Sequence, residues 1–228
     1  MSKKIGNPEL NNKKLKDIIE KIQMNLLFLN NDKDFRDYVL ELVDPSSDIL
    51  DVGKSMRDKF KLIKCQNKKT LDINQFDDYP DIQMDLSDEV VEVEKTDFYQ
   101  KFDVIICLAV LEHVYDPIKA VKNISKFLKK DGTIFGYVPF LYNYHAPDNL
   151  AFQDFYRYSK DGIAYLFKDF DSLTLYPVRG KISSSLHVMF GSWWKKYFEK
   201  LPINFLLNKL YSKPNNLKQC SGYYFIAK

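Results

Sequence analysis

The chain has 228 residues, of which 45% are hydrophobic and 29% are charged. This balance is typical of one medium-sized globular domain and excludes a disordered chain. The formal net charge of only +3 does not favour a nucleic-acid partner. Three scattered cysteines offer neither a disulfide framework nor a zinc pattern, and the amino terminus shows no secretory signal. We therefore expect a cytoplasmic protein, and we find no apolar stretch of about 18 residues that would span a membrane.

Predicted helices and strands alternate along the chain. Apolar residues near a helical period predict helices in 11–43, the second of them over Phe35–Val43. The run 47–53 then predicts a buried strand that ends in a tight turn at Gly53. Further short apolar runs predict strands over 70–73, 81–86, 102–108, 133–138, 172–178 and 222–227.

The helix between the fourth and fifth predicted strands has clear boundaries. Asp116 is its predicted N-cap, Pro117 its first residue and Asp131-Gly132 its end. Its predicted buried stripe is Ile118, Val121, Ile124 and Leu128. A later helix is predicted to begin after Ser159. Strands that alternate with helices predict a parallel sheet covered by helices on both faces.

Residues 181–218 differ from the rest of the chain because they combine seven lysines with one acid, Glu199, for a local charge of +6. Aromatic and leucine residues are interleaved with these lysines. We interpret the segment as a helical insertion before the last strand. Three roles are predicted for it: a lid over a bound substrate, a patch that touches an anionic membrane, or an ordinary helical cap. Of the two functional roles we prefer the lid.

Polar residues stand at the ends of four consecutive predicted strands, where ligands bind in an open α/β sheet. Asp51 and Gly53 end the first strand, Asp72 the second and Asp85 the third. Residues 108–113 end the fourth. Carboxylates at such ends suit a ribose diol and an exocyclic amine.

These segments resemble the class I S-adenosylmethionine-dependent methyltransferases. The resemblance rests on ILDVG (49–53), TLDIN (70–74), DIQMDL (81–86) and FDVIICLAVLEHVYDP (102–117). It implies a Rossmann-like three-layer α/β sandwich with a mostly parallel seven-stranded sheet and an antiparallel last strand pair. We expect an N-terminal helical cap over 1–44 and a methyltransferase domain over 45–228.

The resemblance also implies where the cofactor S-adenosyl-L-methionine binds. Asp51 and Gly53 would border its methionine part, Asp72 its ribose and Asp85 its adenine amine. The first motif reads DVGKSMR and departs from the family's glycine-rich pattern, so its lysine and arginine are candidates for the cofactor carboxylate. The predicted cofactor-binding residues are Asp51, Gly53, Lys54, Ser55, Arg57, Asp72, Ile73, Asp85, Leu86 and Leu108.

Acceptor-binding candidates follow the fifth strand, because loops at the carboxyl ends of strands lie over the ligand. The pattern across 139–162 resembles methyltransferases that accompany glycan biosynthesis. His145 is a candidate general base, Asp154 a second base or its orienting partner, and His113 a further catalytic candidate. Arg157 would bind a phosphate, or pair structurally with Asp154. The predicted substrate-binding residues are Tyr142, Tyr144, Tyr156 and Arg157.

The predicted function is methyl transfer to oxygen or nitrogen of a small polar acceptor, such as a sugar, a nucleotide sugar or another surface-glycan precursor. No nucleic-acid partner is expected, since the fourth strand ends in CLAVLEH and lacks an Asn- or Asp-Pro-Pro-aromatic tetrapeptide. We expect no stable membrane association. We also expect no metal, because no clustered Asp/His set resembles a metal-dependent O-methyltransferase site. The alternative is a non-catalytic binding module of the same fold, which the degenerate first motif motivates.

Overall fold

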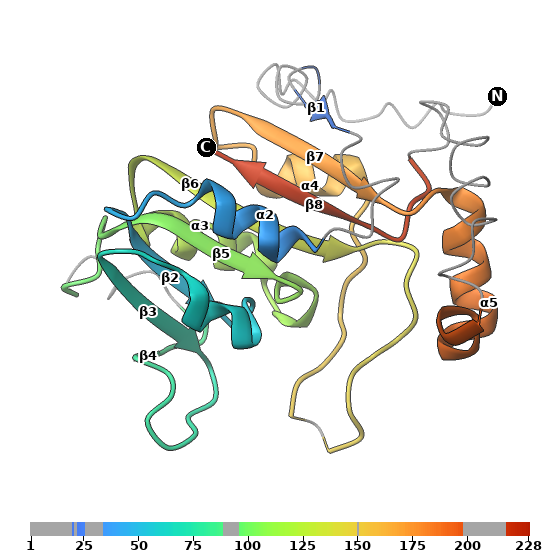
Figure 1. Cartoon of the computed structure of the whole chain (residues 1–228), viewed down its shortest axis with the longest axis horizontal. Coiled ribbons are helices and arrows are strands. Elements are labelled where there is room, and N and C mark those ends of the chain that lie inside the picture. The colour runs from blue at the N-terminus through green and yellow to red at the C-terminus, as the bar shows by residue number, and fades with distance from the viewer. Residues whose placement is uncertain (1–19, 21, 26–33, 89–95, 150, 198–217) are drawn as a thin grey trace, which may run out of the picture.

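The computed structural model describes residues 20, 22–25, 34–88, 96–149, 151–197 and 218–228, with only the backbone described over 192–197. Most of the predicted N-terminal cap and the second half of the basic insertion lie outside these residues. The described strands form one sheet in the order β1-β7-β8-β6-β5-β2-β3-β4 (Figure 1). Their bounds are β1 Gln23–Met24, β2 Asp48–Val52, β3 Asn67–Asp72, β4 Ile82–Gln83, β5 Phe102–Leu108, β6 Leu128–Pro139, β7 Leu173–Val178 and β8 Gly222–Ala227.

Strand directions match the expected topology. Only β8 runs against its two neighbours, β6 and β7, and every other pair is parallel. The chain order reverses between β2 and β5, which defines the switch point where ligands bind in such sheets. The prediction of a mostly parallel Rossmann-like sheet with an antiparallel last pair is confirmed. The sheet has eight described strands instead of the predicted seven because β1 is added at one edge.

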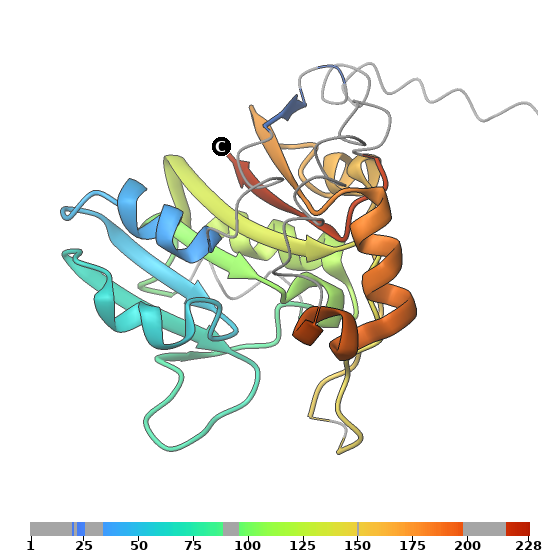
Figure 2. The ribbon, with the colours of Figure 1, turned by 45° about the vertical axis from the view of Figure 1, so that its right-hand side comes forward.

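Helices cover both faces of the sheet, as the views in Figure 1 and Figure 2 show. Helix α2 lies on one face, and α3 and α4 lie on the other. Along β5 the side chains alternate between the two cores: Ile105 and Cys107 face one, and Ile106 and Leu108 the other. The helices are α2 Phe35–Leu42, η1 Arg57–Leu62, η3 Leu111–His113, α3 Pro117–Phe127, α4 Lys160–Leu166 and α5 Lys181–Tyr197.

The first helical prediction is partly wrong. Within the predicted helical region 11–43, Gln23 and Met24 form strand β1, which pairs in parallel with Thr174 and Leu175 of β7. The backbone N–H of the next residue, Asn25, also donates to Leu175 O at 2.8 Å. An open sheet edge therefore overrides the local helical pattern. The second predicted helix is confirmed as α2.

Helix α3 begins as predicted and ends earlier than predicted. The Asp116 side chain accepts a hydrogen bond from Lys119 N, and Pro117 is the first helical residue. The helix ends at Phe127, four residues before Asp131, because its last carbonyls accept backbone hydrogen bonds from residues 100 and 101. Leu128 consequently starts β6, and Ile118 of the predicted buried stripe is 49% exposed.

This topology places the loops after β2, β3, β5 and β6 at one edge of the sheet, beside the switch point. In the part of the chain that the structure describes, no helix is long and apolar enough to cross a membrane.

Candidate active site

The turn after β2 requires a glycine. Gly53 has a φ of +65°, and a Cβ built on it would lie 2.7 Å from Cγ2 of Val110. Its backbone N–H donates to Leu71 O at 2.8 Å, so the turn also joins the end of β3. Lys54 and Arg57 have positive φ values as well. Such a sharp turn exposes backbone at the sheet edge where the predicted cofactor site lies.

Two predicted cofactor residues face the interior. The buried Asp51 carboxylate accepts hydrogen bonds of 3.2 Å from Met56 N, and burial raises its pKa to about 7. The Ser55 hydroxyl donates to Val52 O and accepts from Leu108 N at 2.7 Å. Both side chains therefore shape the turn from within the protein. Direct contact of either with the cofactor stays a prediction.

Asp72 and Lys54 are linked through Tyr79 at the ends of β2 and β3. The Tyr79 hydroxyl donates to Asp72 Oδ2 at 3.0 Å, and Lys54 Nζ lies 4.2 Å from the centre of the Tyr79 ring. Asp72 Oδ1 also accepts from Asn74 N at 3.0 Å. Ile73 beside them is 53% exposed. The structure thus brings together the residues predicted to bind the ribose and the cofactor carboxylate.

The remaining predicted cofactor residues lie on neighbouring segments. Asp85 follows β4 and accepts a hydrogen bond from Ser87 N at 2.7 Å. Leu86 and Leu108 are buried, and Arg57 is exposed at the start of η1. The two leucines belong to the core, whereas Asp85 is half-buried and Arg57 exposed, and their contact with a ligand stays a prediction.

This edge fits S-adenosylmethionine in two respects. The backbone at Gly53 lies so close to Val110 that only glycine fits, and Asp72 presents a partly exposed carboxylate at the neighbouring strand end. A carboxylate accepts hydrogen bonds from a ribose diol. Asp51 and Ser55 fit less directly, because their polar atoms are already bonded within the turn.

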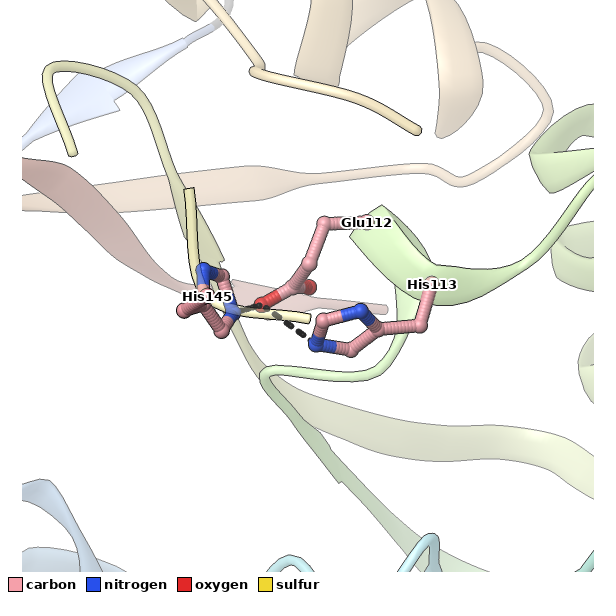
Figure 3. Close-up of side chains that lie close together, drawn as sticks. All are labelled: Glu112, His113 and His145. Carbon is pink, nitrogen blue, oxygen red and sulfur yellow. Dashed lines mark ion pairs between the residues drawn. The ribbon is translucent and has the colours of Figure 1, made fainter. Parts of the chain in front are cut away.

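Three predicted or adjacent polar residues meet at the ends of β5 and β6, as Figure 3 shows. Glu112 and His113 lie on η3, and His145 reaches them from the loop after β6. Glu112 Oε1 lies 3.8 Å from Nε2 of both histidines. The two imidazole rings meet edge to face, 4.8 Å apart. Glu112 was not among the predicted site residues, although its place in VLEH next to His113 was a usable signal.

The Glu112 carboxylate influences His145 most strongly. At 3.8 Å it is too distant for a hydrogen bond, yet it is the main reason that the pKa of His145 lies above its usual value. Burial acts in the opposite direction, and the Asp154 carboxylate, 3.1 Å from Nδ1, raises this pKa further. The raised pKa means that the His145 imidazole accepts a proton more readily than a free histidine does.

Asp154 is held as an ion by Arg157. The guanidinium contacts both carboxylate oxygens, one of them at 2.6 Å, and it is the main reason that the pKa of Asp154 falls to about 2. Such a carboxylate is a weak base and a good orienting partner for His145, whose backbone N–H donates to it at 2.9 Å. The structural ion pair between Arg157 and Asp154, which was the predicted alternative to a phosphate contact, is therefore present.

Arg157 is fully engaged within the chain. Its five N–H groups donate to the Asp154 carboxylate twice and to the carbonyls of Tyr142, Asn143 and Tyr156. An acceptor phosphate would have to displace one of these partners. Arg157 therefore stabilises the segment that follows β6, and its predicted substrate contact stays a prediction.

The predicted substrate tyrosines take different positions. The Tyr142 ring lies 5.5 Å from His145 and 5.5 Å from His187 of α5. Tyr144 is 69% exposed, and Tyr156 donates its hydroxyl to Tyr115 O at 2.8 Å. Tyr142 is accordingly the tyrosine that lies beside the histidine pair.

The structure adds a cluster that the sequence did not show, and the no-metal expectation stays a prediction. The ligand-type atoms of Glu112, His113 and His145 all lie within 4.8 Å of one another. The sequence separates these residues, and the folding of the loop after β6 against η3 brings them together. Backbone N–H groups of Phe155 and Tyr156 donate to Glu112 O and fix that contact.

Comparison with known proteins identifies the family. Residues 27–194 match the family described as the methyltransferase domain. This match covers more than half of the chain, which therefore belongs to the methyltransferase domain family within the class I S-adenosylmethionine-dependent superfamily. The expectations of a methyltransferase and of S-adenosylmethionine as its cofactor are confirmed at this level.

Solved structures share the fold at low sequence identity. An S-adenosylmethionine-dependent methyltransferase from Archaeoglobus fulgidus is 13% identical, with a TM-score of 0.54 over 85% of this chain and 94% of that one. The cyclase SpnF is 11% identical, with a TM-score of 0.50 over 94% of this chain and 91% of its own.

Two curated relatives match a short segment. The tRNA U34 carboxymethyltransferase of Sulfurimonas denitrificans is 40% identical over 63 residues, which are 27% of this chain and 20% of that protein. Its counterpart from a Sulfurovum species is 41% identical over 54 residues, 23% of this chain and 18% of that protein. The chain thus spans about a fifth of the length of the curated relatives it matches.

Proposed function

We propose that the protein transfers a methyl group from S-adenosylmethionine to a hydroxyl or amine of a small polar acceptor, a sugar, nucleotide sugar or other surface-glycan precursor. The observation that carries this proposal is the placement of His145 and His113, beside Tyr142, at the carboxyl ends of β5 and β6. In this fold that edge faces the ligand.

The cofactor, when bound, would supply an electrophilic methyl group on a sulfonium, and transfer of that group to a lone pair of the acceptor would leave S-adenosylhomocysteine. Asp72 holds the ribose, and the turn at Gly53 lets the backbone approach. His145 takes the acceptor's proton on Nε2, because its Nδ1 is turned toward Asp154 and Asn143 O. Alignment and exclusion of water supply the remaining acceleration.

An RNA acceptor is the second candidate, since the curated relatives are tRNA carboxymethyltransferases. The matched segments are short, and the chain's net charge is only +3. A small acceptor agrees better with the segment that follows β6, because the positive charge of Arg157 there is already paired with Asp154 and is not offered to an RNA backbone.

A transfer assay with tritium-labelled methyl groups separates these candidates. The full chain is incubated with labelled S-adenosylmethionine and either a panel of nucleotide sugars or bulk tRNA. We expect label in the sugar fraction and none in tRNA above a no-enzyme control. Label in tRNA alone would overturn the proposed acceptor class. The absence of any transfer, together with no heat in a titration with S-adenosylhomocysteine, would favour the non-catalytic binding module.

A further inference from the structure

We propose that Glu112, His113 and His145 form a binding site for one divalent metal ion with the ligand preference of Zn²⁺. The sites at the ends of β2 and β3 are separate from it. Binding of the ion depends on these three side chains and on the groups that orient them, and it does not depend on the proposed function. Its role in the reaction, described below, rests on the proposed methyl transfer.

The distances suit three ligands of one ion. Glu112 Oε1 is 3.8 Å from Nε2 of each histidine, and all three ligand atoms lie within 4.8 Å of one another. Ligands that each stand about 2.0–2.2 Å from a tetrahedral ion are roughly 3–4 Å apart, so small side-chain shifts are enough. Figure 3 shows the carboxylate between the two rings.

The hydrogen bonds of the two rings turn their lone pairs toward the same carboxylate. Nδ1 of His113 lies 2.5 Å from Gln153 O, and Nδ1 of His145 lies 3.2 Å from Asn143 O. A carbonyl oxygen only accepts, so Nδ1 carries the proton in each neutral ring. Both Nε2 atoms then present lone pairs to an acceptor-only carboxylate. Three electron-rich atoms that converge in this way would be stabilised by a cation between them.

Glu112 itself is a buried acid whose charge lacks compensation by hydrogen bonds. Its side chain is 1% exposed, and within the described parts of the chain neither carboxylate oxygen accepts a hydrogen bond. A buried charge is strongly unfavourable unless it is paired or binds a metal. The neighbouring Asp154 is different, because Arg157 neutralises it. Glu112 is thus the anion that a bound cation would balance.

The surroundings of the histidines resemble the outer shell of known metal sites. Metal-binding imidazoles usually donate their second N–H to a carbonyl or a carboxylate, which fixes the ring. Gln153 O does this for His113, and Asp154 Oδ2, 3.1 Å from Nδ1, does it for His145. Arg157 in turn fixes Asp154. The geometry therefore assigns Asp154 as a positioning residue for the metal ligand.

The donor set selects the ion. Two imidazoles and one carboxylate suit Zn²⁺ and similar first-row ions, whereas Mg²⁺ prefers oxygen ligands and retains its water. Three protein ligands leave a fourth position open, as in catalytic zinc sites. At the ends of β5 and β6 that position faces the proposed acceptor. With the ion bound, Nε2 of His145 would be a ligand and would no longer act as the base. The ion would instead hold the acceptor through a hydroxyl oxygen and ease loss of its proton to solvent, which favours O-methylation.

Titration calorimetry of Zn²⁺ into the full chain, freed of metal by a chelator, tests the site. We expect one Zn²⁺ per chain, and a Co²⁺ absorption spectrum of nitrogen and oxygen ligation. His113→Gln, His145→Gln and Glu112→Gln should each weaken binding by more than the ~10–100-fold typical of an outer-shell change. Asp154→Asn should weaken it ~10–100-fold.

Matched controls exclude binding elsewhere. His187→Gln changes the third histidine of the chain and should bind Zn²⁺ like the wild type. Cys65→Ser removes the one partly exposed thiol and should also have no effect. Circular dichroism of each variant shows whether it is folded; His113→Gln and His145→Gln keep the test decisive if the buried Glu112→Gln variant unfolds.

Two results would overturn the proposal: a wild-type chain that binds neither Zn²⁺, Co²⁺ nor Mn²⁺, or folded ligand variants that bind Zn²⁺ as tightly as the wild type. The first result would mean that protons balance Glu112 instead. Titration with S-adenosylhomocysteine in the same samples keeps this outcome separate from the proposed function. Cofactor binding without Zn²⁺ binding rejects only the metal site, and Zn²⁺ binding without cofactor binding rejects only the methyl transfer.

Discussion

The Ser55 hydroxyl accepts a hydrogen bond of 2.7 Å from the backbone N–H of Leu108 and donates to Val52 O. One side chain thus joins the end of β2 to the end of β5, the two strands that flank the switch point. The serine that replaces a glycine of the family's first motif therefore has a structural use. It fixes the spacing of the edge at which the proposed cofactor site lies.

Ser55→Ala should destabilise the protein by about 1–3 kcal/mol, because it leaves the buried N–H of Leu108 without its acceptor. Urea unfolding followed by circular dichroism measures the change. Ser46→Ala is the matched control, since the Ser46 hydroxyl is exposed and its bond to Asp44 is worth little. Equal stability of both variants would contradict the bridging role.

Asp72→Ala should weaken the binding of S-adenosylhomocysteine at least about tenfold, since each charge-assisted hydrogen bond to a ribose diol is worth about 1.5–3 kcal/mol. Calorimetry measures the affinity, and a thermal scan checks that the variant is folded. Tyr79→Phe is an informative companion, because it removes only the hydroxyl that now bonds Asp72. Unchanged affinity of Asp72→Ala would remove this residue from the cofactor site.

Asp51 should make the protein less stable as the pH rises. Burial raises its folded pKa to about 7, so the native state holds one proton more than the unfolded state between about pH 4 and pH 7. Stability is then lost as pH rises through this window, and the whole penalty remains above it. Asp51→Asn lacks the penalty and keeps an acceptor for Met56 N.

Urea unfolding at about pH 5 and about pH 8 measures this effect. The stability of Asp51→Asn relative to the wild type should increase with pH, by an amount on the order of 1–3 kcal/mol. Asp44→Asn is the control, because hydrogen bonds from Ser46 lower the pKa of Asp44 and its titration lies below this range. A flat difference for Asp51→Asn would show that its carboxylate is solvated.

Local patterns predicted much of the sheet and its loops. The strand ends at Asp51, Asp72 and Leu108 follow from short apolar runs that close with a turn, and the structure places them at one edge. Strand β1 escaped prediction because its only support is pairing with Thr174 and Leu175 far along the chain. Local periodicity carries no information about such a partner.

The residues of the candidate site were likewise only partly predictable from local sequence. His113 and His145 could be selected from the sequence because histidines are rare here and both follow predicted strands. For Glu112 the sequence offered only its place next to His113, since its importance arises from burial and from a loop contact across 40 residues, where His113 meets Gln153 O. The Asp154–Arg157 pair lies within one turn and was foreseeable as an alternative.

His145→Ala should lower methyl transfer by about 10²–10⁴, the usual contribution of a positioned base, while cofactor affinity stays unchanged. Tyr165→Phe serves as a control, because this 41% exposed tyrosine of α4 is not among the predicted site residues. Initial rates with the acceptor found in the transfer assay measure the effect. A change below about fivefold would show that another group takes the proton or that the acceptor needs no base.

The basic segment 181–218 should not bind membranes at physiological salt. Its charge of +6 would support salt-sensitive binding, since each lysine near an anionic surface contributes about 1 kcal/mol. Yet Gly191, at φ 55° and ψ −135°, interrupts α5, so a single interfacial helix is not formed. A Cβ at Gly191 would lie 3.8 Å from Asn143 Nδ2, and His187 lies beside Tyr142. These contacts support the lid.

Co-sedimentation with anionic vesicles measures this, with neutral vesicles as the control. We expect the protein to stay in the supernatant in both. Pelleting with anionic vesicles that decreases as salt rises would contradict the lid and indicate a lipid-linked acceptor. In that case Met189→Glu, which adds charge to a 72% exposed apolar residue of α5, should abolish pelleting if this helix makes the contact. The same variant should leave cofactor binding unchanged, because residue 189 lies outside the proposed cofactor site.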